Sequence, residues 1–249
     1  MDPQSPINRI TVLGVPVDIL APDRIEEVAY LFEDGRNHQI VLLSLWDLMR
    51  ARRSGEFRGM IAGASLVLPI SRSIVRGARF LRKPEPVRYM PFDFIVSLLG
   101  ALERRGRSVY LLGSSRTVIQ RAEANIKSTF PGLRVVGRYS GRYPKHMEAA
   151  IIEAVRKSTP SLLLVGSGAP GRERWIPRNL ARFNSGLYLW CSDLFEVFAK
   201  RRGKPSRELF ARGLEWMPYL ARRPWRAYRL FVFLWYEILL LIARLRGGD

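Results

Sequence analysis

The residues best suited to chemistry follow two apolar runs of this 249-residue chain. The run 162–165 leads into the stretch 166–175, which has the pattern GxGxPxxExW, and the run 187–191 leads to Asp193 and Glu196. Glycines without a Cβ let backbone N–H groups approach a phosphate or a sugar. The two carboxylates are placed to contact a ribose or sugar hydroxyl. Two alternatives stay open: an ordinary strand-to-helix turn for the glycines, and N-cap and first-turn acids for Asp193 and Glu196.

A second turn of the same kind follows the apolar run 108–112, where the chain continues as Gly113-Ser114-Ser115. In an open α/β sheet, ligands bind at the carboxyl ends of the parallel strands. Two such turns are therefore expected to face one cleft and to bind a nucleotide there. The complete dinucleotide pattern GxGxxG and the P-loop lysine pattern are both absent, so NAD and P-loop chemistry are not predicted.

Alternating strand-like and helix-like segments predict an α/β fold: a Rossmann-like, mainly parallel sheet with flanking helices. The expected strands are 10–17, 39–45, 64–68, 108–112, 133–137, 162–165 and 187–191. The expected helices of the body are 23–33, 47–53, 91–104, 118–128, 147–157 and 174–183.

After about residue 202 the sequence becomes basic and aromatic, with expected helices at 206–216, 218–222 and 224–245. This predicts an α/β body over 1–201 and a helical, membrane-associating appendage over 202–249. The net charge of the chain is +19, and residues 200–249 hold twelve Lys or Arg against four Asp or Glu. Basic charge beside an apolar stretch is typical of a peripheral membrane anchor. A helix packed on the body or in an oligomer interface is the alternative.

Other classes of site find little support. The single cysteine, Cys191, excludes an internal disulfide and favours a reducing compartment. His38 and His146 are far from it in sequence and are expected at the surface, so no metal site and no cofactor are predicted. The first residues show no secretory signal, and no apolar run reaches the roughly 18–20 residues that span a bilayer.

Several motifs in a fixed order make the chain similar to the WecG/TagA/CpsF glycosyltransferases over nearly its whole length. They are Gly14-Val-Pro-Val-Asp18, Ala64-Ser-Leu-Val-Leu-Pro69, Arg88 with Asp93, Leu111-Leu-Gly113, Phe130-Pro-Gly-Leu133, the stretch 166–175 and Gly213-Leu-Glu-Trp216 followed by Pro224. The resemblance implies transfer of N-acetylmannosamine or a related sugar from a UDP donor to a polyprenyl-diphosphate-linked saccharide.

The resemblance also implies roles for individual residues. The donor-binding residues that it and the turns suggest are Arg88, Gly113, Ser114, Gly166, Gly168, Pro170, Arg172, Glu173 and Asp193. The family's proposed catalytic base is an aspartate directly after the proline of its LPDG segment, and here that position is Ile70. Isoleucine cannot accept a proton, so Asp93 or Glu196 is expected to activate the acceptor hydroxyl.

Family members engage the lipid diphosphate with arginines of the C-terminal appendage, and here Arg222, Arg223, Arg226 and Arg229 surround Pro224. Arginine forks bind phosphate in a bidentate manner and stabilise a departing diphosphate. A solvated basic face against anionic lipid is the alternative. The expected partners are a UDP-sugar, a polyprenyl-diphosphate-linked acceptor and an anionic membrane surface, and the apolar tail is compatible with a homo-oligomer. The expected location is cytoplasmic, at the inner face of a bacterial plasma membrane.

Two functions from different classes follow. The first is a glycosyltransferase of bacterial surface polysaccharide biosynthesis. The second is a catalytically degenerate relative that acts as a binding or scaffolding partner in a polysaccharide assembly complex, because Ile70 and other departures affect family positions. A nucleic-acid-binding protein would rest on charge alone, without a recognised motif, so no nucleic-acid partner is predicted.

Overall fold

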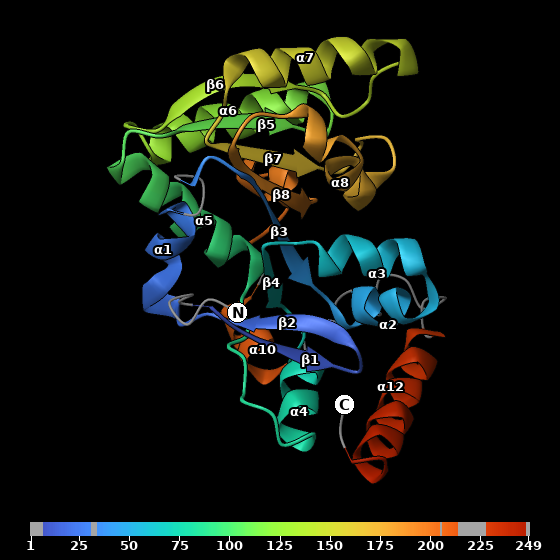
Figure 1. Ribbon diagram of the computed structural model, residues 1–249. Helices are drawn as coiled ribbons and strands as arrows, with labels where there is room; N and C mark the ends of the chain where they lie inside the picture. The colour runs from blue at the N-terminus through green and yellow to red at the C-terminus, as the bar shows by residue number, and fades with distance from the viewer. Residues whose placement is uncertain (1–6, 31–33, 205, 214–227, 248–249) are drawn as a thin grey trace. The chain divides into compact units, whose positions relative to one another are not determined.

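The computed structural model describes residues 7–30, 34–204, 206–213 and 228–247. Contacts between residues group the chain into two units, each made of separate segments (Figure 1). Unit 1 comprises residues 1–22, 42–90 and 205–249, and unit 2 comprises residues 23–41 and 91–204. The predicted division into 1–201 and 202–249 stays a prediction.

The prediction of an α/β fold with a mainly parallel sheet is confirmed. Within the described chain the main sheet has six strands, in the order β4-β3-β8-β7-β5-β6. Its strands are β3 (Asn37–Leu43), β4 (Leu66–Pro69), β5 (Ser108–Leu112), β6 (Arg134–Tyr139), β7 (Leu162–Gly166) and β8 (Gly186–Ser192). In unit 2 the pairs β3–β8, β7–β8, β5–β7 and β5–β6 are all parallel, so the carboxyl ends of these strands lie at one edge.

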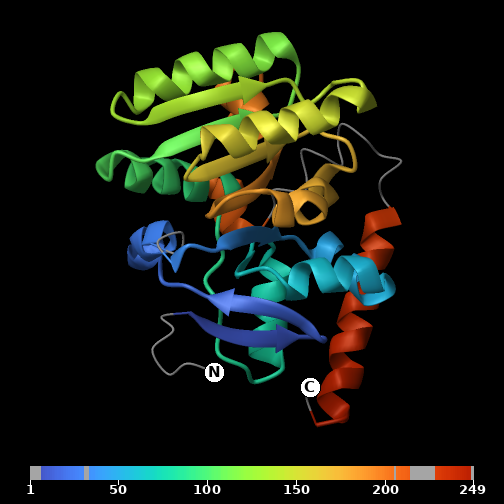
Figure 2. The ribbon, with the colours of Figure 1, turned by 45° about the horizontal axis from the view of Figure 1, so that its top comes forward.

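Helices cover both faces of the sheet in unit 2. Its helices are α1 (Ile25–Tyr30), α5 (Pro91–Arg104), α6 (Arg116–Thr129), α7 (Glu148–Ser158), α8 (Trp175–Asn179) and α9 (Leu194–Phe198), with short 3-10 turns η1 (Pro22–Arg24), η3 (Lys145–Met147), η4 (Arg172–Arg174) and η5 (Leu180–Arg182). Tyr110, Leu112, Leu163 and Val165 pack with α7 and α8 in one buried cluster. Because side chains alternate along a strand, their neighbours in sequence face the opposite side, where α6 lies (Figure 2).

Unit 1 begins with a hairpin where the sequence predicted one strand over 10–17. Strands β1 (Asn8–Val12) and β2 (Val15–Ile19) pair antiparallel and form a separate two-stranded sheet. The turn places Leu13 and Gly14 in the left-handed region, at φ 51° and φ 74°. A bidentate ion pair joins Arg9 to the fully buried Asp18, at 2.6 and 2.8 Å. Asp18 also accepts the backbone N–H of Val67 in β4, so this pair anchors the hairpin to β4.

The remaining helices of unit 1 are α2 (Leu45–Arg53), α3 (Gly55–Ala62), α4 (Arg72–Phe80), α10 (Arg207–Arg212) and α12 (Tyr228–Leu245). Helices α3 and α4 were not predicted from the sequence. Of the appendage helices predicted from the sequence, α10 ends at Arg212, four residues earlier than expected, and α12 is described from Tyr228 onward, because residues 214–227, which include 218–222, lie outside the described residues.

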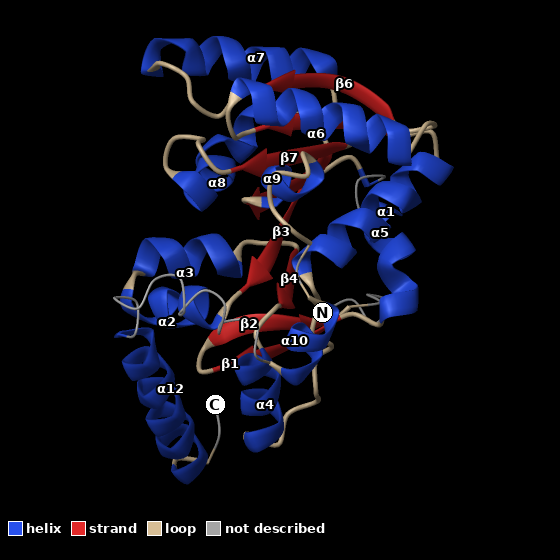
Figure 3. Cartoon of the chain, turned by 180° about the vertical axis from the view of Figure 1, so that it is seen from behind, coloured by secondary structure: helices blue, strands red, loops and turns tan. Residues whose placement is uncertain are grey.

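Helix α12 packs against α2 and α4 through one face (Figure 3). On that face Tyr236 and Leu240 are buried, and the Tyr236 hydroxyl donates to the carbonyl of Ser73 across 3.0 Å. A Cβ at Gly77 would collide with this hydroxyl. A glycine on α4 therefore makes room for the tyrosine. Within the described chain, none of the helices combines the length and the apolar character that crossing a bilayer requires.

Candidate functional site

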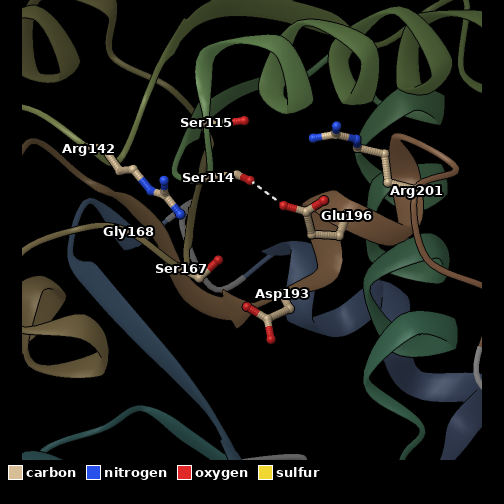
Figure 4. Close-up of a pocket in the computed structure, with 8 residues that line it drawn as sticks. All are labelled: Ser114, Ser115, Arg142, Ser167, Gly168, Asp193, Glu196 and Arg201. Atoms are coloured by element: carbon tan, nitrogen blue, oxygen red, sulfur yellow. Dashed lines mark hydrogen bonds between the residues drawn. The ribbon is translucent and has the colours of Figure 1, made fainter.

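A polar pocket lies at the carboxyl ends of the strands in unit 2 (Figure 4). Its volume is about 390 Å³. The residues that line it come from the turns after β5, β6, β7 and β8, from the first turn of α9 and from the segment after α9: Ser114, Ser115, Arg142, Ser167, Gly168, Asp193, Glu196 and Arg201. The expectation that the turns after β5 and β7 would face one cleft is thus met within this unit.

Glycines bring the turns of this edge into close contact. A Cβ at Gly113 would lie 2.8 Å from the Cα and the nitrogen of Gly166, and a Cβ at Gly141 would lie 2.8 Å from the nitrogen of Ala169. Real side chains do not tolerate such distances, so these positions require glycine for backbone packing. Gly168, which lines the pocket, has a φ of 97°. Residues with a side chain rarely adopt this backbone conformation, so the position favours glycine.

Ser114 links three turns through its backbone. Its N–H donates to the carbonyl of Ser167 across 2.5 Å, and its own carbonyl accepts from the N–H of Gly141 across 3.1 Å and from the hydroxyl of Ser140 across 3.0 Å. The residue has φ 54°, a left-handed conformation that costs energy in a residue other than glycine. These bonds hold that conformation and present the Ser114 side chain to the pocket.

The two acidic residues of the pocket already have partners. The Ser114 hydroxyl donates to a carboxylate oxygen of Glu196 across 2.9 Å. Asp193 lies 3.6 Å from the guanidinium of Arg202. Asp193 occupies the N-cap position of α9, and Glu196 lies in its first turn, yet Asp193 makes no side-chain capping bond. Both carboxylates line the pocket, as the ligand-contact interpretation requires.

Two arginines and a helix N-terminus supply positive charge around the same space. The side chains of Arg142 and Arg201 lie on opposite sides of the pocket (Figure 4). Ser115 is the N-cap residue of the 14-residue helix α6, and its side chain makes no capping bond. The first N–H groups of a helix have no intrahelical partner and carry positive partial charge. The site can therefore hold an anion beside groups that accept hydrogen bonds from hydroxyls.

The remainder of the motif 166–175 serves to anchor its loop. Trp175 is 1% exposed, and its indole nitrogen donates to Glu148 across 2.9 Å. Gly171 and Arg172 both have left-handed backbone conformations. Pro170, Arg172 and Glu173 are not among the residues that line the pocket. Their assignment to donor binding stays a prediction.

Other predicted site residues lie elsewhere. Arg88 belongs to unit 1, where its guanidinium donates to the carbonyls of Ile70 and Phe210 and lies 3.6 Å from the Phe210 ring centroid. Asp93 is in the first turn of α5 and does not line the pocket. Gly113 and Gly166 support the turns, as described above.

The tail arginines fall mostly outside the described residues. Arg222, Arg223 and Arg226 lie there, and Arg229 is near the start of α12. Among the described residues, no three His, Cys, Asp or Glu side chains come together where they could hold a metal ion. His38, expected at the surface, is instead 8% exposed on β3, and its Nε2 lies 2.8 Å from a carboxylate oxygen of Asp34.

Arg142 and Arg201 were not predicted from the sequence. The expected strand 133–137 ends two residues before the observed end of β6 at Tyr139, which placed Arg142 too far from the strand end. Had the strand been extended to Tyr139, the parallel arrangement would have brought residues 140–142 to the ligand edge. Arg201 follows the short helix α9, and nothing in the sequence there distinguishes it from its basic neighbours.

Comparison with known proteins supports the resemblance. The family model described as "Glycosyl transferase WecG/TagA/CpsF family" matches residues 10–248. A protein of Bacillus spizizenii strain W23, named N-acetylglucosaminyldiphosphoundecaprenol N-acetyl-beta-D-mannosaminyltransferase, is 25% identical over 178 residues, which are 71% of this chain and 68% of the relative. A protein of the same name from Bacillus subtilis strain 168 is 22% identical over 180 residues, or 72% of this chain and 70% of the relative. Since the family model covers nearly the whole chain, this protein belongs to the WecG/TagA/CpsF family of glycosyl transferases.

Proposed function

We propose that this protein transfers a sugar from a UDP-sugar to a polyprenyl-diphosphate-linked saccharide during the synthesis of a bacterial surface polysaccharide. The observation that carries the proposal is the polar pocket at the strand ends of unit 2, in a chain whose family match spans residues 10–248. The names of two relatives describe transfer of N-acetylmannosamine to an N-acetylglucosaminyl-diphosphoundecaprenol. A related acceptor is therefore the natural one to test.

In such a reaction the acceptor hydroxyl oxygen forms a bond to C1 of the sugar while the bond from C1 to the diphosphate breaks. The hydroxyl proton needs an acceptor, and position 70 offers only a hydrocarbon side chain. Glu196 is the better placed of the two predicted bases because it lines the pocket and Asp93 does not. Its hydrogen bond from Ser114 orients the carboxylate and leaves lone pairs on both oxygens for a further proton.

A transfer assay tests this proposal. Purified protein is incubated with UDP-N-acetylmannosamine and other UDP-sugars, together with N-acetylglucosaminyl-diphosphoundecaprenol or a shorter-chain analogue, and the lipid product is followed by mass spectrometry. Turnover should fall by about 100-fold or more in Glu196→Ala, the size of a general-base contribution. Asp93→Ala is compared in parallel. Full turnover in both variants would eliminate this acid–base assignment.

The second candidate function is a degenerate family member that binds its partners without catalysis. Ile70 favours it, because the residue offers no titratable group, and its N–H and carbonyl are taken up by Leu43 and Arg88. A protein of this kind would bind UDP-sugars or the lipid-linked saccharide but would not turn them over. A gain of transfer in Ile70→Asp would indicate that the rest of the site is competent.

Helix α12 supports the proposed membrane contact. Apart from Arg244, its exposed residues from 231 to 245 are apolar and follow one another at helical spacing: Phe231, Leu234, Trp235, Ile238, Leu241, Ile242 and Leu245. Phe231 is 73% exposed and Leu245 is 86% exposed, although large apolar side chains on a helix are usually buried. An interfacial helix would bury such a stripe at the lipid surface. This location would give the enzyme access to a lipid-linked acceptor.

A further inference from the structure

The lining of the unit 2 pocket differs from that of a nucleobase site. Its described lining consists of serines, one glycine, two acidic residues and two arginines, with no aromatic or aliphatic side chain. Bases are usually held by stacking on aromatic rings and by apolar contacts. Phosphate groups are held by guanidinium forks, hydroxyls and backbone N–H groups at helix N-termini. The pocket therefore fits the charged part of a nucleotide and not its base.

Within the described residues, the two carboxylates and the two arginines that line the pocket form no ion pair with one another. Asp193 lies near Arg202, and Glu196 accepts the Ser114 hydroxyl. Arg142 and Arg201 line the same pocket, yet within the described part of the chain their guanidinium groups make no ion pair and no hydrogen bond. In contrast, Arg156 on α7 forms a bidentate pair with Glu153.

The two arginines are placed to act from two sides. Arg142 enters from the turn after β6 and Arg201 from the segment after α9, and Figure 4 shows them on opposite sides of the pocket. The N-terminus of α6 at Ser115 forms a third side. A diphosphate in this space would meet positive charge from all three directions. A single phosphate could reach all of them less readily.

We propose that Arg142 and Arg201 clamp the diphosphate of the sugar donor, and that the nucleobase binds outside this pocket. The inference rests on the proposed function, which supplies a nucleoside-diphosphate sugar as the donor. When the bond from C1 to the diphosphate breaks, the electron pair stays on the departing phosphate oxygen. The two guanidinium groups neutralise that charge and so favour departure.

Binding of inorganic pyrophosphate, UDP and uridine to the full chain tests the clamp. Titration calorimetry is run on the wild type, Arg142→Gln, Arg201→Gln and the double variant, with Arg156→Gln as a matched control outside the pocket. Each single pocket variant should weaken binding of pyrophosphate and of UDP by about 10-fold or more, the usual size of a lost charge-assisted hydrogen bond. The Arg156→Gln control should bind like the wild type, and the pocket variants should leave any binding of uridine unchanged.

Equal pyrophosphate affinity in the wild type and the double variant would overturn the proposal, and so would a wild type that binds no pyrophosphate. Thermal unfolding of each variant shows whether it is folded, and Arg142→Lys and Arg201→Lys add a graded comparison. Lysine keeps the charge without the fork, so partial recovery of pyrophosphate binding is expected. Arginine-dependent binding without any sugar transfer would leave the clamp standing and refute the proposed function. Sugar transfer together with pyrophosphate binding that does not depend on the two arginines would support the proposed function and refute the clamp.

Discussion

The indole nitrogen of Trp175 donates to the carboxylate of Glu148 across 2.9 Å, and this bond fixes the end of the loop 166–175 to the first residue of α7. The tryptophan is almost completely buried, so its N–H has no access to water. Ser167 and Gly168, near the start of the same loop, line the pocket. The structure thus gives the last residue of the family motif a role in holding the loop.

Replacing Glu148 should therefore destabilise unit 2. In Glu148→Ala the buried indole N–H loses its acceptor, which costs about 1–3 kcal/mol. Glu148→Gln keeps an oxygen acceptor and should cost less. The free energy of unfolding in urea measures the difference. Glu153→Ala on the exposed side of α7 is the matched control, and a loss as large in that variant would remove the explanation.

The raised pKa of the Tyr143 hydroxyl predicts how the free energy of unfolding changes at alkaline pH. Burial, with the negative charge of Glu148, raises the pKa of its hydroxyl to about 12. In the unfolded chain the group ionises near the ordinary value of about 10. Between these two values the unfolded state binds fewer protons than the folded state, so the stability that Tyr143 contributes below pH 10 is lost as the pH rises toward 12.

The measurement is the free energy of unfolding across this pH range in the wild type and in Tyr143→Phe. Phenylalanine has no hydroxyl to ionise, so the variant should lose stability less steeply as the pH rises. Burial also raises the pKa of Tyr188 and Tyr236, which means that part of the slope remains. Identical slopes in the two proteins would show that Tyr143 ionises equally in both states.

Gly77→Ala should detach α12 from α4. The added methyl group would collide with the Tyr236 hydroxyl and would lie 3.3 Å from a methyl carbon of Leu240. Hydrogen exchange of the α12 amides should become faster. Gly59→Ala is the control, because a Cβ at this position of α3 meets nothing within 4 Å. That variant should be neutral or more stable, since alanine favours a helix by about 0.5–1 kcal/mol over glycine.

The apolar stripe of α12 should determine binding to lipid. Replacing both Trp235 and Leu241 by serine removes two exposed apolar side chains, each worth about 1.5–3 kcal/mol when buried. Partitioning onto anionic phosphatidylglycerol vesicles should fall by at least 10-fold in co-sedimentation. Val136→Ser, which changes an exposed apolar residue of β6, should bind like the wild type. Unchanged partitioning of the double variant would count against the membrane contact.

The ion pair between Arg9 and Asp18 predicts a large effect on stability. The Asp18 side chain is fully buried, and the Arg9 side chain is 32% exposed. Arg9→Met would leave a buried carboxylate without its charge partner and should cost about 3–5 kcal/mol. Denaturation by guanidinium chloride measures this loss. The double variant Arg9→Met, Asp18→Leu should recover part of it, and a single variant as stable as the wild type would refute the account.

The pocket residues that the sequence predicted share one property. Ser114, Gly168, Asp193 and Glu196 follow strands buried on both faces, and such strands appear in the sequence as unbroken apolar runs. Strand β6 alternates between exposed and half-buried residues, as expected at a sheet edge, so its end was misplaced and Arg142 was missed. A pocket residue is predictable where the strand before it is clearly delimited.

Other differences arise from contacts between distant residues. Helix α4 contains Ile74, Val75 and Gly77, which lower its helix propensity, and its buried face is completed by Tyr236 from α12. The segment 10–17 was expected to form one strand, although the alternation of its apolar residues changes phase at Gly14, from positions 10 and 12 to positions 15 and 17. The left-handed conformation of Leu13, which creates the hairpin, is unusual for a leucine and has no sequence signal.

The interleaved segments of the two units affect the order in which the chain can fold during synthesis. Unit 2 consists of residues up to Lys204, so all its strands can pair once that residue has left the ribosome. Unit 1 begins earlier in the chain, yet the bond between Ser73 and Tyr236 joins residues 163 positions apart. The buried face of α4 therefore stays uncovered until α12 has been made. Strands β1 and β2, which are made before any part of unit 2, thus belong to the unit that is completed last, and a nascent chain that stalls before α12 would expose that face to chaperones.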